Sequence, residues 1–271
     1  MKLFQAKHEL WLHLLFSSFA IKDPVIKEKL YELSQISFRH LKWIAKSYRE
    51  DNKYYDYKRN VINIKHDDVF NTLTHLKERI IENQQYYLVG ELFFRIREDE
   101  NYFISVIDSY LDDVTCNAPI TAFNKNMTYQ DKKLGSKQRD ALILFLFEET
   151  YKEYELILIY FYMQNYTDSL LHFDVYQDLV DESQFHLKSF GNMLAELGLL
   201  AIPREVHEMS YKITDLDAFI LNGIDEELNA KEECRKLAEA VDDPELEVFF
   251  NFINYQENYH IELMKKLLVE K

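Results

Sequence analysis

The sequence predicts an all-α protein in which antiparallel helical hairpins form two four-helix bundles in tandem. Only five Gly and four Pro occur among the 271 residues, far fewer than a turn-rich β protein needs. The prolines stand at apparent element boundaries, at Pro24, Pro119, Pro203 and Pro244. A layout of residues in the first half of the chain also recurs in the second half. Four hairpins are therefore expected, and two hairpins make one four-helix bundle.

The first predicted domain, residues 1–115, contains two hairpins. The first hairpin runs from about residue 4 to residue 49 and turns at Lys22-Asp23-Pro24. The second covers about residues 67–111 and turns near Gly90. Residues 116–138 are polar and are interrupted by Asn117-Ala118-Pro119 and Leu134-Gly135-Ser136, which predicts a linker.

The second predicted domain, residues 139–271, contains the other two hairpins. The third hairpin covers about residues 137–198 and turns between Asn165 and Asp168. The fourth covers about residues 214–269 and turns at Asp242-Asp243-Pro244. Asp243 is the expected N-cap of its last helix and Pro244 the first helical residue, because Asp accepts hydrogen bonds from free backbone N–H groups there and proline needs no donor.

Hairpins one and three share a sequence layout that indicates an internal duplication. Glu9-Leu10 precedes His40-Leu41-Lys42 in hairpin one, and Glu155-Leu156 precedes His186-Leu187-Lys188 in hairpin three. The Glu-to-His spacing is 31 in both hairpins. Most other aligned positions differ, so the two copies retain a common layout and little side-chain identity.

Composition narrows the class of protein. Apolar residues make up 47% of the chain, which is ample for a packed core. Cys116 and Cys234 lie 118 positions apart and outside any C-x-x-C pair, so neither a cysteine metal site nor a disulfide framework is supported. No apolar run is long enough to span a bilayer, and no leader segment is evident. A cytoplasmic protein that does not bind membranes is expected.

The charge is concentrated in the second half of the chain. Residues 1–140 contain 22 Lys and Arg against 20 Asp and Glu, whereas residues 141–271 contain 10 against 27. Such a negative field attracts cations and repels nucleic acid, although a Glu-rich solvated surface would give the same count. No Gly-rich phosphate loop, G-x-S-x-G motif or basic aromatic strip is present, so nucleotide, acyl-transfer and nucleic-acid functions are unsupported.

The fourth hairpin carries the clearest metal-ligand pattern. Glu257 and His260 are three residues apart, and on a helix residues i and i+3 point the same way. Glu227 lies 30 residues before Glu257, and the midpoint between them is residue 242, at the predicted turn. Two antiparallel helices joined there bring Glu227 level with Glu257 and His260. This arrangement is typical of one half of a dinuclear carboxylate site.

The segment from about residue 216 to residue 268 resembles the ferritin-like superfamily and is most similar to rubrerythrins. The resemblance rests on Glu227, Ala230, the run Asp243-Pro244-Glu245-Leu246 and Glu257-x-x-His260. It implies a four-helix bundle that holds two iron or manganese ions and reacts with O₂ or peroxide. In that family pattern each helix pair gives one Glu and one Glu-x-x-His.

The third hairpin should complete the site, but it departs from this pattern. Glu149 is the preferred ligand of its first helix, because the midpoint of Glu149 and Glu182 is 165.5, inside the predicted turn. Glu153, one turn along on the same face, is the alternative. His186 is the expected nitrogen ligand, yet Ser183 precedes it at i−3 where a Glu is expected. Glu182, at i−4, could share a centre with His186 through a π-bulge.

The expected ligand set therefore gives each metal one imidazole and shares two carboxylates. Glu149 and Glu227 are the outer carboxylates, Glu182 and Glu257 the bridging ones, and His186 and His260 the nitrogen ligands. Their total charge of −4 would be prohibitive in a core unless cations or protons balance it. Oxygen-rich ligation favours two iron or manganese ions over zinc.

The first bundle is predicted to be a degenerate copy that packs against the second. The midpoint of Glu9 and Ser37 is residue 23, so His40 lies at the right level, but Ser37 takes the place of a bridging carboxylate. Tyr102 or Phe103 stands where a second histidine is expected. A mononuclear or altered site that uses Glu9 and His40 is the alternative.

Three functions follow from these expectations. The first is an oxidoreductase that binds two metal ions, reacts with O₂ or peroxide and takes electrons from an external donor, since the two cysteines cannot form the cysteine-ligated iron domain of a full rubrerythrin. The second is a metal-free helical scaffold that binds a partner. The third is an iron-binding or storage protein. The sequence is also compatible with a homodimer.

Overall fold

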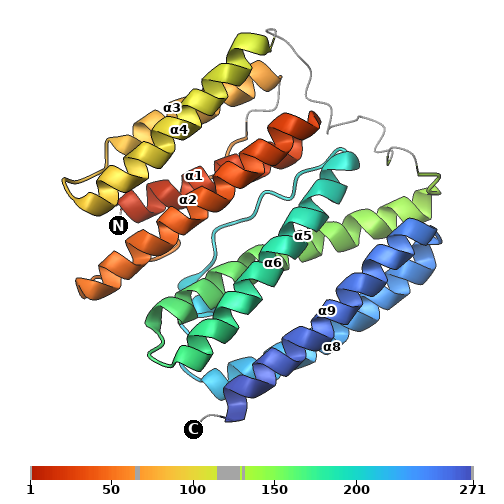
Figure 1. The fold of residues 1–271 in the computed structure, drawn as a ribbon. Helices are drawn as coiled ribbons and strands as arrows, with labels where there is room; N and C mark the ends of the chain where they lie inside the picture. Colours follow the sequence, from red (N-terminus) through yellow and green to blue (C-terminus); the bar gives the residue numbers. More distant parts are fainter. Residues whose placement is uncertain (1, 65–67, 115–128, 130–131, 270–271) are drawn as a thin grey trace. The chain divides into compact units, whose positions relative to one another are not determined.

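The protein is helical, as the sequence predicts. The structure, a computed structural model, describes residues 2–64, 68–114, 129 and 132–269, and its regular secondary structure in these ranges is all α-helix with no strand. The chain divides into two compact units (Figure 1). Unit 1 comprises residues 1–123 and 204–207, and unit 2 comprises residues 124–203 and 208–271.

Unit 1 consists of two helical hairpins. Its helices are α1 (Lys2–Ala20), α2 (Pro24–Glu50), α3 (Val69–Gln84) and α4 (Glu91–Asp113). Helix α1 contacts α2 and α3, and α4 contacts α2 and α3. The Asp23 carboxylate accepts hydrogen bonds from the Val25 and Ile26 amides at 2.9 and 3.0 Å, which starts α2 with proline as its first residue. The predicted turn at residues 22–24 is confirmed.

Helix α1 is the centre of unit 1. Nearly all of its residues are buried, which matches a helix that is apolar around most of its circumference. The segment after α2 covers part of it, because Tyr55 and Tyr57 are buried and the Tyr55 ring lies 4.3 Å from that of Phe4, centre to centre. Polar residues of α1 such as Lys7 are therefore forced into the interior of the unit.

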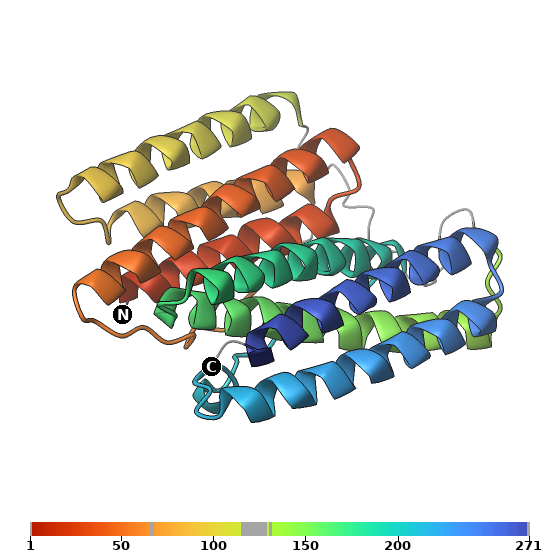
Figure 2. The same ribbon diagram turned by 60° about the horizontal axis from the view of Figure 1, so that its bottom comes forward.

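Unit 2 also consists of two hairpins, with one short helix between them. Its helices are α5 (Ser136–Tyr166), α6 (Leu170–Glu196), α7 (Glu208–Tyr211), α8 (Leu216–Val241) and α9 (Pro244–Val269). Helix α5 contacts α6 and α8, and α9 contacts α6 and α8 (Figure 2). The Asp243 carboxylate accepts hydrogen bonds from the Glu245 and Leu246 amides, both at 3.1 Å. The predicted cap and proline start of α9 are confirmed.

One apolar cluster of unit 2 lies toward the α8–α9 turn. It includes Leu146 of α5, Phe190 of α6, Val241 of α8 and Phe250 of α9. The buried carboxylates and histidines of the same four helices lie beyond this cluster along the helices. The packed core therefore holds the helices in the register that brings those polar side chains together.

The boundary between the two units lies near the middle of the chain. The chain divides after residue 123, which falls within the predicted linker 116–138. Cys116, Pro119 and most of that linker lie outside the described residues. Residues 204–207 belong to unit 1, which the sequence does not predict, and there the Glu205 carboxylate accepts a 3.2 Å hydrogen bond from the Arg59 amide.

Candidate metal centre

Four helices of unit 2 each contribute a buried polar side chain to one cluster. These are Glu153 of α5, His186 of α6, Glu227 of α8, and Glu257 with His260 of α9. Glu257 and His260 share one face of α9 because they are three residues apart. None of the five residues is more than 8% exposed, so their charges must be balanced inside the protein.

His186 lies at the first group of potential ligands. Its Nδ1 atom is 2.9 Å from a Glu153 carboxylate oxygen and 3.8 Å from Glu257 Oε1. One potential ligand atom from each of these three residues falls within 4.8 Å of the others. Such a spacing allows a single cation to contact all three.

His260 lies at the second group. Its Nδ1 atom is 3.0 Å from Glu257 Oε2 and 3.6 Å from Glu227 Oε1, and these three residues also meet the 4.8 Å spacing. Glu257 therefore belongs to both groups, with one carboxylate oxygen toward each histidine. The two imidazole rings lie 5.5 Å apart, centre to centre.

The second nitrogen of each imidazole faces away from its group. His186 Nε2 is 3.2 Å from the side-chain oxygen of Gln256, and His260 Nε2 is 3.0 Å from Glu182 Oε2. The contact between His260 and Glu182 lacks the directionality of a hydrogen bond. Without a cation, each Nδ1 must direct an N–H group toward the carboxylates, because a lone pair there would face negative charge. A bound cation would take the place of that proton.

The electrostatics of the cluster favour positive charge. Burial lowers the pKa of His186, but Glu153 and Glu257 outweigh burial and raise it to about 9. Burial likewise lowers the pKa of His260, and the surrounding carboxylates raise it to about 12. Burial and the neighbouring Glu227 raise the pKa of Glu257 to about 8. A cluster that takes up protons in this way would bind cations in their place.

No family model, no curated protein and no solved structure matches this chain. None of the helices in the described ranges has both the length and the apolar character that crossing a bilayer requires. The site must therefore be interpreted from its own geometry.

The structure brings most of the predicted ligands together but gives Glu149 a different partner. The Lys152 ammonium lies 2.7 Å from a Glu149 carboxylate oxygen, and Glu149 belongs to neither group of potential ligands in the described chain. Burial raises the pKa of Glu149 to about 7, even though Lys152 acts to lower it. Glu153, the alternative, contacts His186. Glu149 and Glu153 are about one helical turn, or about 5.4 Å, apart along α5. Counting residues from an assumed turn between two helices is not accurate enough to choose between them.

Glu182 and Ser183 occupy distinct positions on α6. Glu182 is half-buried and lies at the Nε2 side of His260, on the opposite side of the ring from Glu227 and Glu257. Ser183 is fully buried, and its hydroxyl has no hydrogen-bond partner among the described residues. No π-bulge interrupts α6, so the local distortion considered for bringing Glu182 and His186 to one centre is not present.

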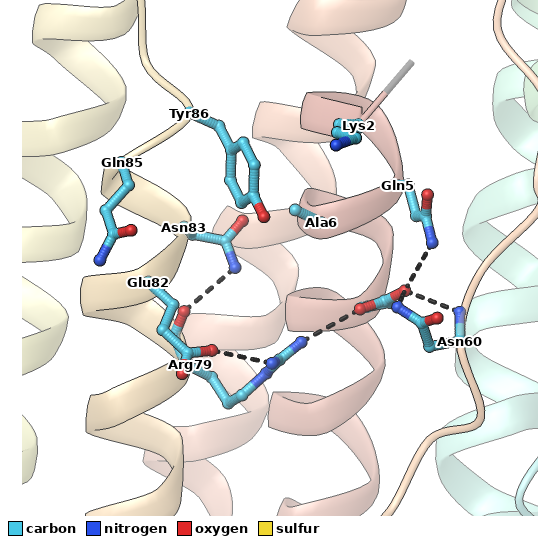
Figure 3. Close-up of a pocket in the computed structure, with 10 residues that line it drawn as sticks. Lys2, Gln5, Ala6, Asn60, Arg79, Glu82, Asn83, Gln85 and Tyr86 are labelled. Carbon is cyan, nitrogen blue, oxygen red and sulfur yellow. Dashed lines mark hydrogen bonds and ion pairs between the residues drawn. The ribbon is translucent and has the colours of Figure 1, made fainter.

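Glu9 and His40 of unit 1 do not share partners. Glu9 accepts a hydrogen bond from the Arg79 guanidinium at 3.0 Å and another from the Asn60 amide at 2.8 Å (Figure 3). These contacts form one wall of a polar pocket of about 520 Å³ between the start of α1 and the end of α3. His40 instead contacts Lys7 and Asp99. The structure thus does not bring Glu9 and His40 into one site.

Three residues lie in or near these clusters although the sequence alone does not indicate a role for them. Gln256 is adjacent to Glu257, but an amide carries no ligand signal by itself. Tyr160 is two turns after Glu153 on the same face, and its fully buried phenol has its pKa raised by burial and by the carboxylates of Glu227 and Glu153. Lys7 has no exposed surface in unit 1. The position of Lys7 within a mostly apolar helical segment was the one sequence signal that could have indicated its burial.

Proposed function

We propose that unit 2 is a dinuclear metal centre of the ferritin-like type, with iron or manganese as its ions. The observation that carries the proposal is Glu257, whose two carboxylate oxygens face the Nδ1 atoms of two different buried histidines. A carboxylate in that position can bridge two cations. Two imidazoles, one bridging carboxylate and one further carboxylate per ion fit hard divalent metals.

The residues of the cluster divide into ligands and groups that orient them. Glu153, His186 and Glu257 would hold one ion, and Glu227, His260 and Glu257 the other. Gln256 and Glu182 would accept the Nε2 protons of the histidines, which keeps each Nδ1 lone pair toward its ion. In this assignment Glu182 supports a ligand, and Glu153 replaces Glu149.

The charge balance supports cation binding over a metal-free scaffold. An unmetallated scaffold would be expected to turn its carboxylates to solvent, yet Glu153, Glu227 and Glu257 are 5%, 8% and 4% exposed. Without cations, burial and the neighbouring Glu227 raise the pKa of Glu257, so that Glu257 retains a proton. For Glu227, burial is outweighed by hydrogen bonds from Glu257 and His260, which lower its pKa. Two divalent ions would remove the need for the proton on Glu257.

The helix contacts support the wider proposal that the chain contains two ferritin-like bundles, of which the second is similar to rubrerythrins. In unit 2 the pairs α5–α6 and α8–α9 pack against each other, and in unit 1 the pairs α1–α2 and α3–α4 do the same. Glu153 and His186 meet between α5 and α6, and Glu227 and His260 meet between α8 and α9. Unit 1 is then the degenerate copy.

The proposed reaction is oxidation or reduction with O₂ or peroxide. When bound, two such ions would supply one electron each and open coordination positions for O₂ or peroxide. The described residues bind and orient the ions, and electrons for turnover would come from an external donor. Iron storage uses the same ligands and is the second candidate, distinguished by whether the chain assembles into a closed shell.

Elemental analysis tests the proposal directly. Protein purified without chelator is compared with the Glu257→Ala/His260→Ala variant, and Glu262→Ala, an exposed position on α9, is the matched control. About two iron or manganese ions per chain are expected in the parent and in the control, and far fewer in the double variant. Less than about a tenth of an ion per chain in the parent, unchanged after reconstitution with Fe(II) or Mn(II), would leave the scaffold function instead.

A further inference from the structure

When the two copies of the predicted internal duplication are aligned in sequence, a lysine of unit 1 corresponds to a proposed ligand of unit 2. His186 lies 146 positions after His40, and the same offset pairs Ser37 with Ser183 and Lys7 with Glu153. In the other hairpins an offset of 157 pairs Glu100 with Glu257 and Phe103 with His260. Lys7, His40 and Glu100 come from α1, α2 and α4, and the proposed ligands of one ion come from the corresponding helices α5, α6 and α9.

The Lys7 ammonium contacts both of the matching residues. Its Nζ atom lies 3.3 Å from His40 Nδ1 and 2.6 Å from Glu100 Oε1, and none of the three side chains is exposed. The Tyr87 hydroxyl also donates a hydrogen bond to Glu100. The cation therefore sits between the imidazole and the carboxylate, where an ion in unit 2 would contact His186 and Glu257.

The orientation of His40 is that of a metal-bound histidine. An ammonium can only donate, so Nδ1 accepts from Lys7, and the proton of the neutral ring is on Nε2. That Nε2–H group donates to Asp99 Oδ2 at 2.9 Å. A ligating histidine makes the same pair of contacts, with its lone pair toward the cation and its N–H toward a carboxylate. Asp99 corresponds to Gln256, which faces Nε2 of His186.

Among the described residues of unit 1, no second position for an ion is found. The buried face of α3, all of which lies in the described chain, carries no acidic residue that would match Glu227 of α8. Phe103 stands in the place of His260 and packs its ring 6.1 Å from that of His40, centre to centre. The positive charge of Lys7 is then balanced by the Glu100 carboxylate, one oxygen of which lies 2.6 Å from the Lys7 ammonium.

We propose that Lys7 is a built-in cation that occupies the metal position of unit 1. Its ammonium group pairs with His40 and Glu100, so that this buried polar centre is charge-balanced without a metal ion. Replacing Lys7 with a carboxylate would convert the centre into a divalent-cation site that uses His40 and Glu100. The inference rests on the proposed function of unit 2 for the class of ion, whereas the contacts of Lys7 are independent of it.

The test uses the full chain with the Glu257→Ala/His260→Ala changes, so that metal bound in unit 2 does not contribute. Lys7→Glu is added to this background, and Lys7→Met is the matched control that removes the charge without adding a ligand. Mn(II) is supplied, excess is removed, and bound manganese is measured. About one ion per chain is expected with Lys7→Glu, and less than a tenth with Lys7 intact or with Lys7→Met. Adding His40→Ala should abolish the gain.

Two results would overturn the proposal. One is a folded Lys7→Glu chain that binds no manganese, and the other is manganese bound in unit 1 with Lys7 intact. If Lys7→Glu does not fold, Lys7→Asp, which also supplies a carboxylate, replaces it in the same background, with the midpoint of thermal unfolding as the measurement. A midpoint that Mn(II) raises in Lys7→Asp but not in Lys7→Asp/Glu100→Gln supports the proposal, and no rise overturns it. Because unit 2 is disabled throughout, these outcomes do not depend on whether unit 2 binds metal.

Discussion

Buried histidines in the two units are in opposite electrostatic environments. In unit 1, burial and, to a smaller extent, nearby arginine or lysine side chains lower the pKa of His8, His13 and His40 to about 3. In unit 2, the carboxylates around His186 and His260 outweigh burial and raise the pKa of both rings. The same side chain is therefore neutral in one unit and cationic in the other, according to the charges around it.

Substituting each of the two candidate carboxylates on α5 in turn should show which one binds the ion. Glu153→Gln should lower metal content or weaken binding by at least about 10-fold, because Glu153 contacts His186 in the first ligand group. Glu149→Gln, one turn away on the same helix, is the matched control and should leave metal content unchanged, since Glu149 is paired with Lys152. Manganese titration of both variants measures the difference. The reverse result would assign the ligand to Glu149.

Glu182 should tune the centre without binding an ion. Glu182→Gln keeps an acceptor near His260 Nε2 but removes its charge. We expect the number of bound ions to stay the same and the affinity to fall by about 10-fold to 100-fold, as for groups that orient a ligand. Asp181→Asn, the exposed neighbour, is the control. Loss of one ion per chain in Glu182→Gln would instead identify Glu182 as a direct ligand.

At the scale of elements, side-chain caps determine where several helices begin. Asp23, Asp68, Ser169, Asp215 and Asp243 each accept a hydrogen bond from a backbone amide in the first turn of the following helix. The five helices that they begin are α2, α3, α6, α8 and α9. Between α8 and α9, Asp242 adopts the left-handed conformation with φ of 50°, which reverses the chain in a short turn. This turn sets the level at which Glu227 meets Glu257 and His260.

The cap of α9 can be tested separately from its ion pair. Asp243→Ala removes the acceptor for the Glu245 and Leu246 amides and should reduce the free energy of unfolding of unit 2 by about 1 kcal/mol. Asp243→Asn retains an effective cap and loses only the charge that faces Lys132 at 3.0 Å, so its effect should be smaller. Urea unfolding of both variants gives the comparison. Equal losses would indicate that the Lys132 ion pair, and not the cap, stabilises this end.

At the scale of the whole molecule, the two units should respond to pH in opposite directions when no metal is bound. In unit 2, His186 and His260 hold protons more tightly when folded, so their contribution to stability is full below about pH 6.5 and declines as pH rises, through about 9 for His186 and about 12 for His260. Glu257 acts in the same direction, with its contribution lost as pH rises through about 8. In unit 1, the neutral histidines contribute fully above about pH 6.5, and this contribution is lost as pH falls toward 3.

Calorimetry of the metal-free full chain at about pH 5.5 and about pH 9 should therefore show two transitions that move in opposite directions. The transition of unit 2 is identified by its shift in Asp243→Ala. Mn(II) should remove the loss of unit 2 stability at high pH, because ligands that have lost their protons bind the ion. Two transitions that both rise or both fall between these pH values would contradict the electrostatic assignment.

The sequence by itself determined the helical fold, the hairpins and the face that carries the ligands of α9. Scarce glycine, prolines at boundaries and an Asp-Pro start are local signals, and helical spacing fixes Glu257 and His260 on one face without reference to other helices. Glu227 could be paired with them because only a short turn separates α8 from α9. The repeated Glu and His spacing likewise pointed to related hairpins.

Tertiary structure decided which side chains of different helices meet. The choice of Glu153 over Glu149, the place of Glu182 behind His260 and the contact of Lys7 with His40 depend on helix rotations and levels within about one turn. Those levels are set by packing between α5, α6, α8 and α9 and between α1, α2 and α4, which involves residues far apart in the chain. Sequence spacing within one helix contains no information about that packing.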